Sequence, residues 1–284
     1  MENILGGRAR GKDRVLDILE DAYRRYHRPE CIRPDPLEVV RRYADPRDQE
    51  IAGLVAALLA YGGVKAIVRS ASAALERLGP SPARTLRQAD SRGWARRLRG
   101  FRHRWTTETE IVGLLKGARV LLRRHGSLRN AFRAGYRPEE ETLLPALQRW
   151  TDALCAAGGA ACRKLVPDPV RGSACKRLLL YLRWMIRRDE VDPGAWRGLS
   201  PSKLVVPLDV HMHRAARRLG LTRRRSADLR TALEVTAAFR RLCPEDPARW
   251  DFALTRAEML GRGGGRYVAR RTNCGREGLT VPRG

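Results

Sequence analysis

The residues CKRLLLYLRWMIRRD, numbers 175–189, combine an apolar helical pattern with a lysine and several arginines. Leucines, Met185 and Ile186 recur at helical spacing, which predicts a helix packed into a core. Lys176 stands at the start of this helix. A lysine amine becomes a nucleophile when burial or neighbouring cations lower its pKa enough to leave part of it uncharged. Lys176 is therefore either a solvated surface charge or a candidate nucleophile.

A second candidate lies downstream in VVPLDVHMHRAARRLGL, residues 205–221. Pro207 cannot continue a helix, so Asp209 stands where the N-cap of the next helix is expected. That capping role accounts for Asp209 by itself, although a carboxylate at a reactive centre also accepts protons or stabilises positive charge. His211 and His213 raise a metal-site alternative. Alternate residues on a helix point about 200° apart, so both would bind one ion only in an unwound segment.

The segment PLDVHMHRAARRLGL resembles part of the helix-hairpin-helix DNA glycosylases, of which endonuclease III is the familiar member. In those proteins an aspartate precedes a histidine by two positions, and an arginine-rich helix ending in Leu-Gly-Leu follows. The stretches SACKRLLLYLRWMIRRDEVDPGAW, SPSKLVVPLDVHMHR, DQEIAGLVAALLAYG and EDPARWDFAL are similar to an uncharacterised bacterial family assigned to the same superfamily. The resemblance implies a two-lobed helical fold. Its hairpin is expected to be atypical, because the common signature Leu-Pro-Gly-Val-Gly is absent.

The resemblance also implies catalytic roles. Glycosylases of this superfamily that nick the DNA backbone use a lysine, which attacks the sugar C1′ of a damaged nucleotide to form a Schiff base, and a downstream aspartate. Lys176 and Asp209 match these positions. The helix end AALLAYGGV corresponds to the region that faces the extruded base, which implies Tyr61 as a wall of the base pocket. The alternative is that Gly62 and Gly63 simply end a helix.

A helical wheel places Lys176, Arg183 and Arg187 on one face, with Trp184 beside Arg177 on the next sector. A basic face that contains an aromatic ring can follow a phosphate backbone and stack an unpaired base. We therefore expect the three arginines to bind nucleic acid and Trp184 to line the base pocket. The alternative is that Trp184 is buried and that the arginine stems cover apolar surface.

Two further segments are expected to contact nucleic acid. His211 and Arg214 lie on the polar side of the downstream helix. Arg102 and Arg104 belong to GFRHRWTTE, where basic and aromatic residues alternate. Such interleaving suits unstacked bases, and a packed loop with surface arginines fits the same pattern.

Helix signals cover most of the chain and no segment alternates convincingly as a strand, so the predicted class is all-α. The expected helices are residues 13–27, 48–61, 64–78, 108–124, 139–155, 173–188, 210–219, 227–241 and 247–260. We expect a single helical domain over 1–262, with one lobe at about 48–165 and a second formed by the N-terminal helix and 166–262. Residues 263–284 are expected to form a flexible, basic, glycine-rich tail.

The net charge of +26 and the pI near 11.2 favour a polyanionic partner. Only six of the 57 basic residues are lysines, as a GC-rich coding bias would give, but such a bias does not explain why only 31 residues are acidic. The predicted partner is duplex DNA, and the resemblance implies that this DNA is damaged. No obligate protein partner is predicted.

No apolar run reaches the length of a signal peptide or a membrane span, which favours a cytoplasmic, nucleoid-associated protein without a membrane partner. The six cysteines form no CxxC pair. Neither a zinc site, a disulfide framework nor an iron-sulfur cluster is therefore indicated, and no metal or cofactor is predicted. We expect mostly buried, free thiols.

The favoured hypothesis is a DNA-repair protein: a base-excision DNA glycosylase, with or without Schiff-base lyase activity. The main alternative is a non-catalytic DNA- or RNA-binding protein on the same scaffold. A metal-dependent hydrolase that uses His211 and His213 ranks third.

Overall fold

The computed structural model describes residues 2–88 and 91–261. Within this part, helices dominate and the only sheet is one short antiparallel hairpin, so the all-α prediction is confirmed. The segment predicted as a tail, 263–284, lies outside the described residues. The α-helices are α1 Glu2–Tyr26, α2 Leu37–Val40, α3 Pro46–Leu58, α4 Val64–Leu78, α5 Pro82–Gln88, α6 Ser91–Leu98, α7 Glu108–His125, α8 Leu128–Ala134, α9 Leu144–Leu165, α10 Lys176–Ile186, α11 Val210–Arg218, α12 Leu229–Arg240 and α13 Asp251–Leu260.

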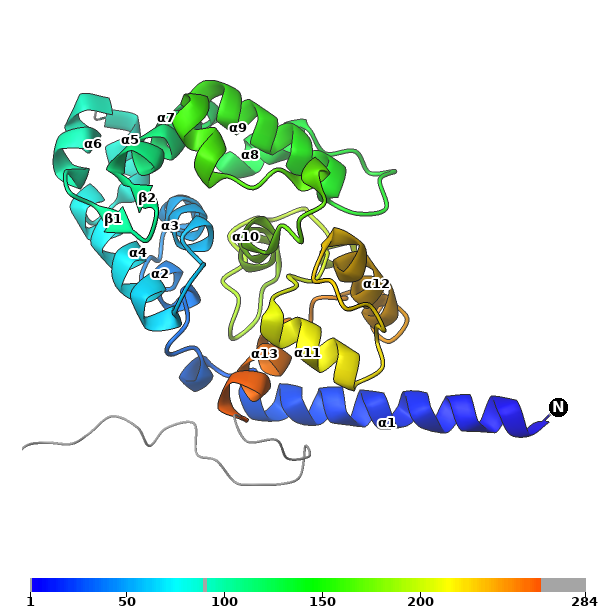
Figure 1. Ribbon diagram of the computed structural model, residues 1–284. Helices are drawn as coiled ribbons and strands as arrows, with labels where there is room; N and C mark the ends of the chain where they lie inside the picture. Colours follow the sequence, from blue (N-terminus) through cyan, green and yellow to red (C-terminus); the bar gives the residue numbers. More distant parts are fainter. Residues whose placement is uncertain (1, 89–90, 262–284) are drawn as a thin grey trace, which may run out of the picture.

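Helix α10 lies in the middle of the molecule (Figure 1). It packs against α3, while α13 packs against both α1 and α11. Helices α5 to α9 lie at the end of the molecule opposite α1 (Figure 1). Helices α7 and α9 pack closely along each other, because a Cβ at Gly113 would lie only 2.8 Å from the Cys162 backbone nitrogen.

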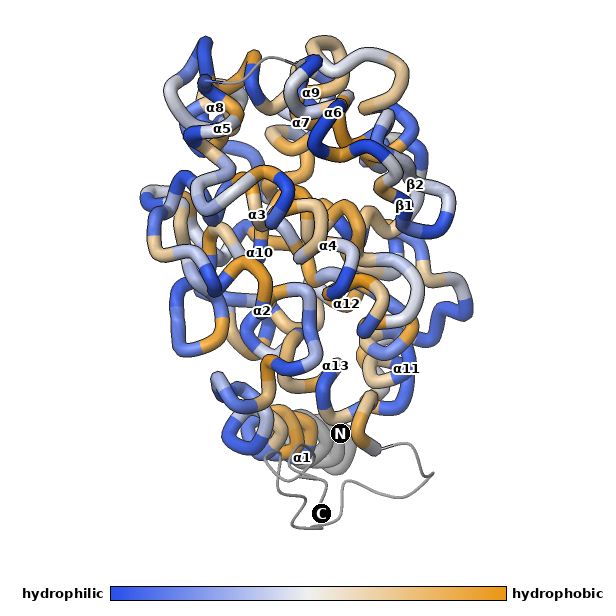
Figure 2. Tube along the Cα trace, turned by 90° about the vertical axis from the view of Figure 1, so that its left-hand side faces the viewer, coloured by the Kyte–Doolittle hydropathy of each residue, from blue (hydrophilic) through white to orange (hydrophobic). Residues whose placement is uncertain are grey.

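One continuous cluster of buried side chains runs from Leu19 in α1 to Leu254 in α13. Apolar segments lie mainly toward the interior and hydrophilic segments toward the periphery (Figure 2). Since this cluster crosses both predicted lobes, the division of the chain into two lobes stays a prediction. None of the described helices is long and apolar enough to cross a membrane.

The expectation that no strand occurs is wrong for one short segment. Strands β1 (Arg102–His103) and β2 (Thr106–Thr107) pair as an antiparallel hairpin, with Arg104 in the left-handed region at φ 54°. Two residues per strand are too few to give a visible alternation of polar and apolar side chains. Helices α2, α5, α6 and α8 were also not predicted, and each is eight residues or fewer.

Side chains at the helix starts cap α7 but not α13. Thr107 and Glu110 form a capping box at the start of α7. Helix α13 begins only at Asp251, later than the expected residue 247, so Asp246 does not cap it. Asp246 instead accepts a hydrogen bond from Arg187 Nε at 2.8 Å. A carboxylate that faces a buried guanidinium gains more from that charge than from a helix end.

Two arginines of α10 form a buried ionic network. Arg183 pairs with Asp192 at 3.2 Å and with Asp251 at 2.5 Å. Arg187 pairs with Asp192, with Asp246 at 2.8 Å and with Asp189 at 2.8 Å. Both arginine side chains are only 3–4% exposed. These contacts fasten α10 to α13, to the segment before α13 and to the loop that follows α10.

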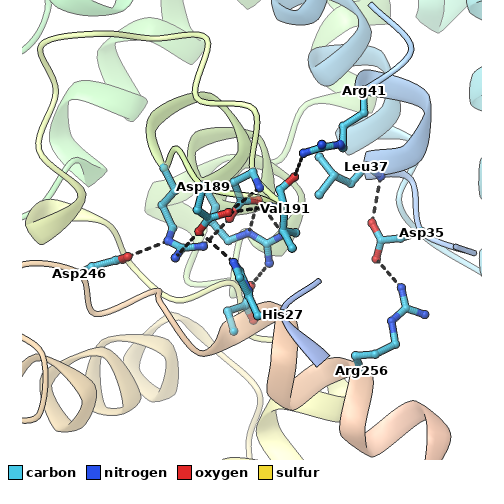
Figure 3. Close-up of polar contacts among 12 residues, drawn as sticks. His27, Asp35, Leu37, Arg41, Asp189, Val191, Asp246 and Arg256 are labelled. Atoms are coloured by element: carbon cyan, nitrogen blue, oxygen red, sulfur yellow. Dashed lines mark hydrogen bonds and ion pairs between the residues drawn. The ribbon is translucent and has the colours of Figure 1, made fainter. Parts of the chain in front are cut away.

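The same network reaches α1. His27 Nε2 lies 2.9 Å from Asp189 Oδ2 (Figure 3). The His27 ring stacks on Tyr23, with 4.3 Å between the centroids. Burial would raise the pKa of Asp189, but the hydrogen bond from His27 and the charge of Arg187 outweigh it and hold this pKa well below its usual value. Asp35 and Arg256 form a neighbouring pair at 3.6 Å (Figure 3).

Substitution Asp192→Ala tests the network. It leaves the guanidinium groups of Arg183 and Arg187 without their shared, fully buried counter-ion, so we expect a loss of about 3–5 kcal/mol in the free energy of unfolding. Urea unfolding followed by circular dichroism measures this loss. Asp152→Ala is the control, because Asp152 pairs with Arg163 at an exposed site and should change stability by less than about 1 kcal/mol. Similar losses in both variants would contradict a structural role for the buried pairs.

Candidate nucleic-acid interface

Lys176 is the first residue of α10 and follows a tight connection from α9. That connection, residues 166–175, contains a 3-10 turn at Pro169–Arg171, a glycine at φ 78° (Gly172) and Cys175 in the left-handed region at φ 46°. The Cys175 carbonyl accepts hydrogen bonds from the N–H groups of Leu178 and Leu179. The chain therefore turns sharply into α10, and no side chain caps the helix.

The structure brings Lys176 and Asp209 into contact. Lys176 Nζ lies 3.2 Å from Asp209 Oδ2, and the two side chains are 32% and 15% exposed. The other carboxylate oxygen, Oδ1, caps α11 by accepting hydrogen bonds from the N–H groups of His211 (2.9 Å) and Met212 (2.8 Å). One oxygen is thus fixed by the helix end, while the second faces the amine at a partly open site.

Three helix N-termini meet at this place. The Lys176–Asp209 pair joins the starts of α10 and α11. Ser173 forms a β-bridge with Asp228, and the Leu229 N–H donates to the Gly172 carbonyl at 3.2 Å, which brings the start of α12 to the same connection. Helix N-termini carry partial positive charge and attract anions. Aspartates cap α11 and α12, whereas the first turn of α10 has no such acceptor.

An aromatic stack lies next to the Lys176 helix turn. Trp105, at the tip of the hairpin, stacks on Tyr61 with centroids 4.5 Å apart, and Arg104 lies over the Trp105 ring at 5.1 Å. The Arg177 guanidinium is 5.3 Å from the Tyr61 centroid. The Tyr61 hydroxyl donates to Thr106 Oγ1 at 2.7 Å. Trp105 is 67% exposed, so this ring, rather than the predicted Tyr61, offers an aromatic face to solvent.

Arg177 is a partly buried cation that forms no ion pair with a carboxylate among the described residues. Its Nη1 donates to the Leu58 carbonyl at 2.8 Å. Burial lowers the pKa of Arg177 below its usual value, because nearby negative charge does not compensate the lost hydration. A guanidinium in this state is ready to pair with an incoming anion.

Three predicted contact residues need correction. Arg183 and Arg187 lie inside the molecule with their aspartate partners, so their guanidinium groups do not reach solvent. Trp184 is 1% exposed and packs in the core, so it does not line an open pocket. These side chains do lie on the faces adjoining Lys176, but other elements cover α10 along most of its length. Its partly exposed residues, Lys176, Arg177 and Leu180, all lie near its start.

The remaining predicted residues lie at or near the surface. Arg102, Arg104 and Arg214 are exposed, and His211 is half-buried. His213 Nε2 contacts the Arg224 carbonyl at 3.0 Å. Among the described residues no group of three or more histidine, cysteine or acidic side chains gathers in a metal-binding arrangement. The five cysteines in that part of the chain are buried thiols that form no disulfide, as predicted, and Cys274 lies outside it.

Sequence reasoning missed two features of this region. Trp105 was visible within GFRHRWTTE, but only the hairpin geometry exposes its ring. The three consecutive arginines at 223–225 are evident in the sequence, but no sequence signal indicates that they lie beside the connection to α10.

Taken together, the fold and the site define an all-helical protein with a lysine–aspartate pair where three helix N-termini meet. A family model described as "Protein of unknown function (DUF2400)" matches residues 35–260, and the chain belongs to this family. No curated protein and no solved structure matches the chain. The predicted membership of an uncharacterised family is therefore confirmed, while the link to DNA glycosylases stays a proposal.

Substitutions at Asp209 separate its two structural contacts. Asp209→Asn keeps an oxygen that can cap α11 and removes the charge facing Lys176, so we expect a loss below about 1 kcal/mol. Asp209→Ala also removes the cap, which adds about 0.5–2 kcal/mol. Urea unfolding of both variants measures the difference. Equal losses would show that the cap contributes nothing measurable.

Proposed function

We propose that the protein is a base-excision DNA glycosylase in which Lys176 is the nucleophile and Asp209 assists it. The observation that carries the proposal is the 3.2 Å contact between Lys176 Nζ and Asp209 Oδ2. These two residues are the pair that the resemblance to helix-hairpin-helix glycosylases picks out. They come from separate helices, and the rest of the sequence offers five other lysines.

The chemistry follows from the two side chains. Asp209 Oδ2 accepts a proton from the Lys176 ammonium, which leaves a neutral amine. The amine forms a bond to C1′ of the damaged nucleotide as the bond between C1′ and the base breaks, and the base departs with the bonding electrons and takes up a proton. If the amine is already neutral, Asp209 instead keeps its charge and stabilises the positive charge that develops on the sugar. Opening of the sugar ring then gives a Schiff base to Lys176, the intermediate of a lyase.

Surrounding charge supports a nucleic-acid partner. The uncapped start of α10, the poorly compensated Arg177 and the exposed Arg104 and Arg214 lie on elements that adjoin the pair. Phosphates bind to such groups through charge and hydrogen bonding. The sugar carbon is inaccessible within a stacked duplex, so the damaged nucleotide must leave the stack. Trp105 offers a ring on which a neighbouring unstacked base can lie.

Borohydride trapping tests the chemistry. Duplexes that carry 8-oxoguanine, uracil or an abasic site are incubated with the protein and borohydride, and we expect a covalent protein–DNA adduct on at least one of them. Lys176→Gln should abolish the adduct because the attacking amine is gone. Lys116→Gln, an exposed lysine on α7, is the matched control and should leave adduct formation unchanged.

Absence of an adduct on every lesion contradicts the lyase step. Release of free base without trapping would then identify a glycosylase without lyase activity, and Asp209→Asn should abolish that release. The second candidate function is a non-catalytic nucleic-acid-binding protein. One observation favours it: capping and ion pairing already give Asp209 and Lys176 a complete structural role. Tight binding with neither adduct nor base release would establish it.

Tryptophan fluorescence tests where the nucleic acid binds. Of the six tryptophans, Trp105 is exposed and the other five are buried or nearly so, so acrylamide quenching reports mainly on Trp105. We expect a duplex with an abasic site to protect Trp105 from acrylamide, because an unstacked base covers its ring. Trp105→Phe should lose the protected component. Unchanged quenching with saturating duplex would place the bound DNA elsewhere.

A further inference from the structure

The turn between α11 and α12, Thr222–Asp228, carries three consecutive arginines and is held by polar contacts on its inner side. Arg224 is only partly exposed, and its side chain folds back onto the turn, where its Nε donates to Thr231 Oγ1 at 2.8 Å and its Nη2 to Asp228 Oδ2 at 2.9 Å. Arg223 and Arg225, its neighbours on either side, are exposed. We call this segment the arginine turn.

The backbone of the arginine turn is tied down at several points. His213 Nε2 contacts the Arg224 carbonyl at 3.0 Å, and Thr231 Oγ1 donates to the Ser226 carbonyl at 2.6 Å. The Arg224 N–H donates to Thr222 Oγ1 at 3.1 Å. A segment with these contacts is already ordered before a ligand arrives, so binding costs less conformational entropy.

The outer arginines are not explained by stability. Arg223, Arg225 and Arg230 have no ion-pair partner in the part of the chain that the structure describes, and the nearby Asp228 pairs with Arg224. Arg230 lies in the first turn of α12, where a cation is disfavoured by the helix dipole. Adjacent like charges also repel each other. This arrangement costs stability in the isolated protein, and an anionic partner would offset the cost.

The arginine turn lies beside the candidate site. Its last residue, Asp228, forms the β-bridge with Ser173, and Leu229 donates to the Gly172 carbonyl. Lys176 follows Ser173 by three residues. If a nucleic acid places one sugar at Lys176, the phosphates next to that sugar therefore lie close to the arginine turn.

We propose that the arginine turn, with Arg230, is a phosphate-binding surface that holds the backbone of duplex DNA next to Lys176. Guanidinium groups fit phosphate oxygens in a bidentate geometry. Contacts of this kind add affinity and set the position of the duplex without reading its sequence. The choice of DNA as the polymer rests on the proposed function, whereas the binding surface rests on the geometry of the arginine turn.

The salt dependence of binding tests this surface. The full chain and its Arg223→Gln/Arg225→Gln variant are titrated with an undamaged fluorescent duplex at a series of NaCl concentrations. The slope of log K against log salt is negative, and each lost phosphate contact reduces its magnitude by about 0.9. We therefore expect the magnitude of the slope to fall by nearly two in this variant. Both side chains are exposed, and circular dichroism confirms that the variant is folded.

The matched control is Arg123→Gln/Arg124→Gln, which removes the same charge from exposed positions at the end of α7. We expect its slope to stay close to that of the unaltered protein. An equal fall in both variants would mean that only net charge matters, and an unchanged slope in the arginine-turn variant would mean that no contact is made there. Either result overturns the inference.

Two further measurements keep this inference separate from the proposed function. Borohydride trapping by the arginine-turn variant at saturating DNA reports on the chemistry alone. An adduct together with an unchanged salt slope supports the glycosylase proposal and contradicts the phosphate-binding surface. A reduced slope in the arginine-turn variant, with no adduct formed by the unaltered protein, supports the phosphate-binding surface and contradicts the glycosylase proposal. Competition with an RNA duplex of equal length tests the polymer, and tighter binding of RNA would overturn the assignment to DNA.

Discussion

The buried pairing of Arg183 and Arg187 with aspartates is the constraint on which the rest of the structure depends. Burying a guanidinium without a counter-ion costs several kcal/mol, so these side chains can lie inside only if carboxylates meet them there. Asp251 comes from α13, Asp246 from the segment before it, and Asp189 and Asp192 from the loop after α10. The positions of these elements around α10 are thereby fixed together.

This constraint determines what the first turn of α10 can do. Since the middle and end of the helix are anchored in the core, Lys176 is held at a defined place at the edge. Asp209 is fixed independently, because one of its oxygens is engaged by the backbone of α11. The backbone of Lys176 and the carboxylate of Asp209 are each positioned by other contacts, and the Lys176 amine lies 3.2 Å from Asp209 Oδ2. Such pre-organisation is a condition for chemistry and also for a stable ion pair.

Much of the fold follows from the sequence, for reasons that particular residues make clear. Helix α4 has the predicted bounds, and Pro207 and Asp209 start α11 as expected, because periodicity and capping act over a few residues. Short elements such as the hairpin at Arg102–Thr107 are not predictable in this way, since two residues per strand carry no periodic signal. Lys176 and Asp209 were singled out by resemblance, and their contact emerges only in three dimensions.

The errors in the predicted interface have one physical origin. A wheel shows which residues share a face of α10, but it does not show which face is covered. Arg183 and Arg187 share a face with Lys176. Beyond the first two turns of the helix, this face is covered by aspartates from the loop after α10 and from the region of α13. Conversely, the arginine turn has no periodic pattern at all, yet the bridge between Ser173 and Asp228 brings it to the connection that precedes Lys176. Carboxylates therefore neutralise the positive charge inside the molecule, whereas at the surface Arg223, Arg225 and Arg230 have no ion-pair partner among the described residues.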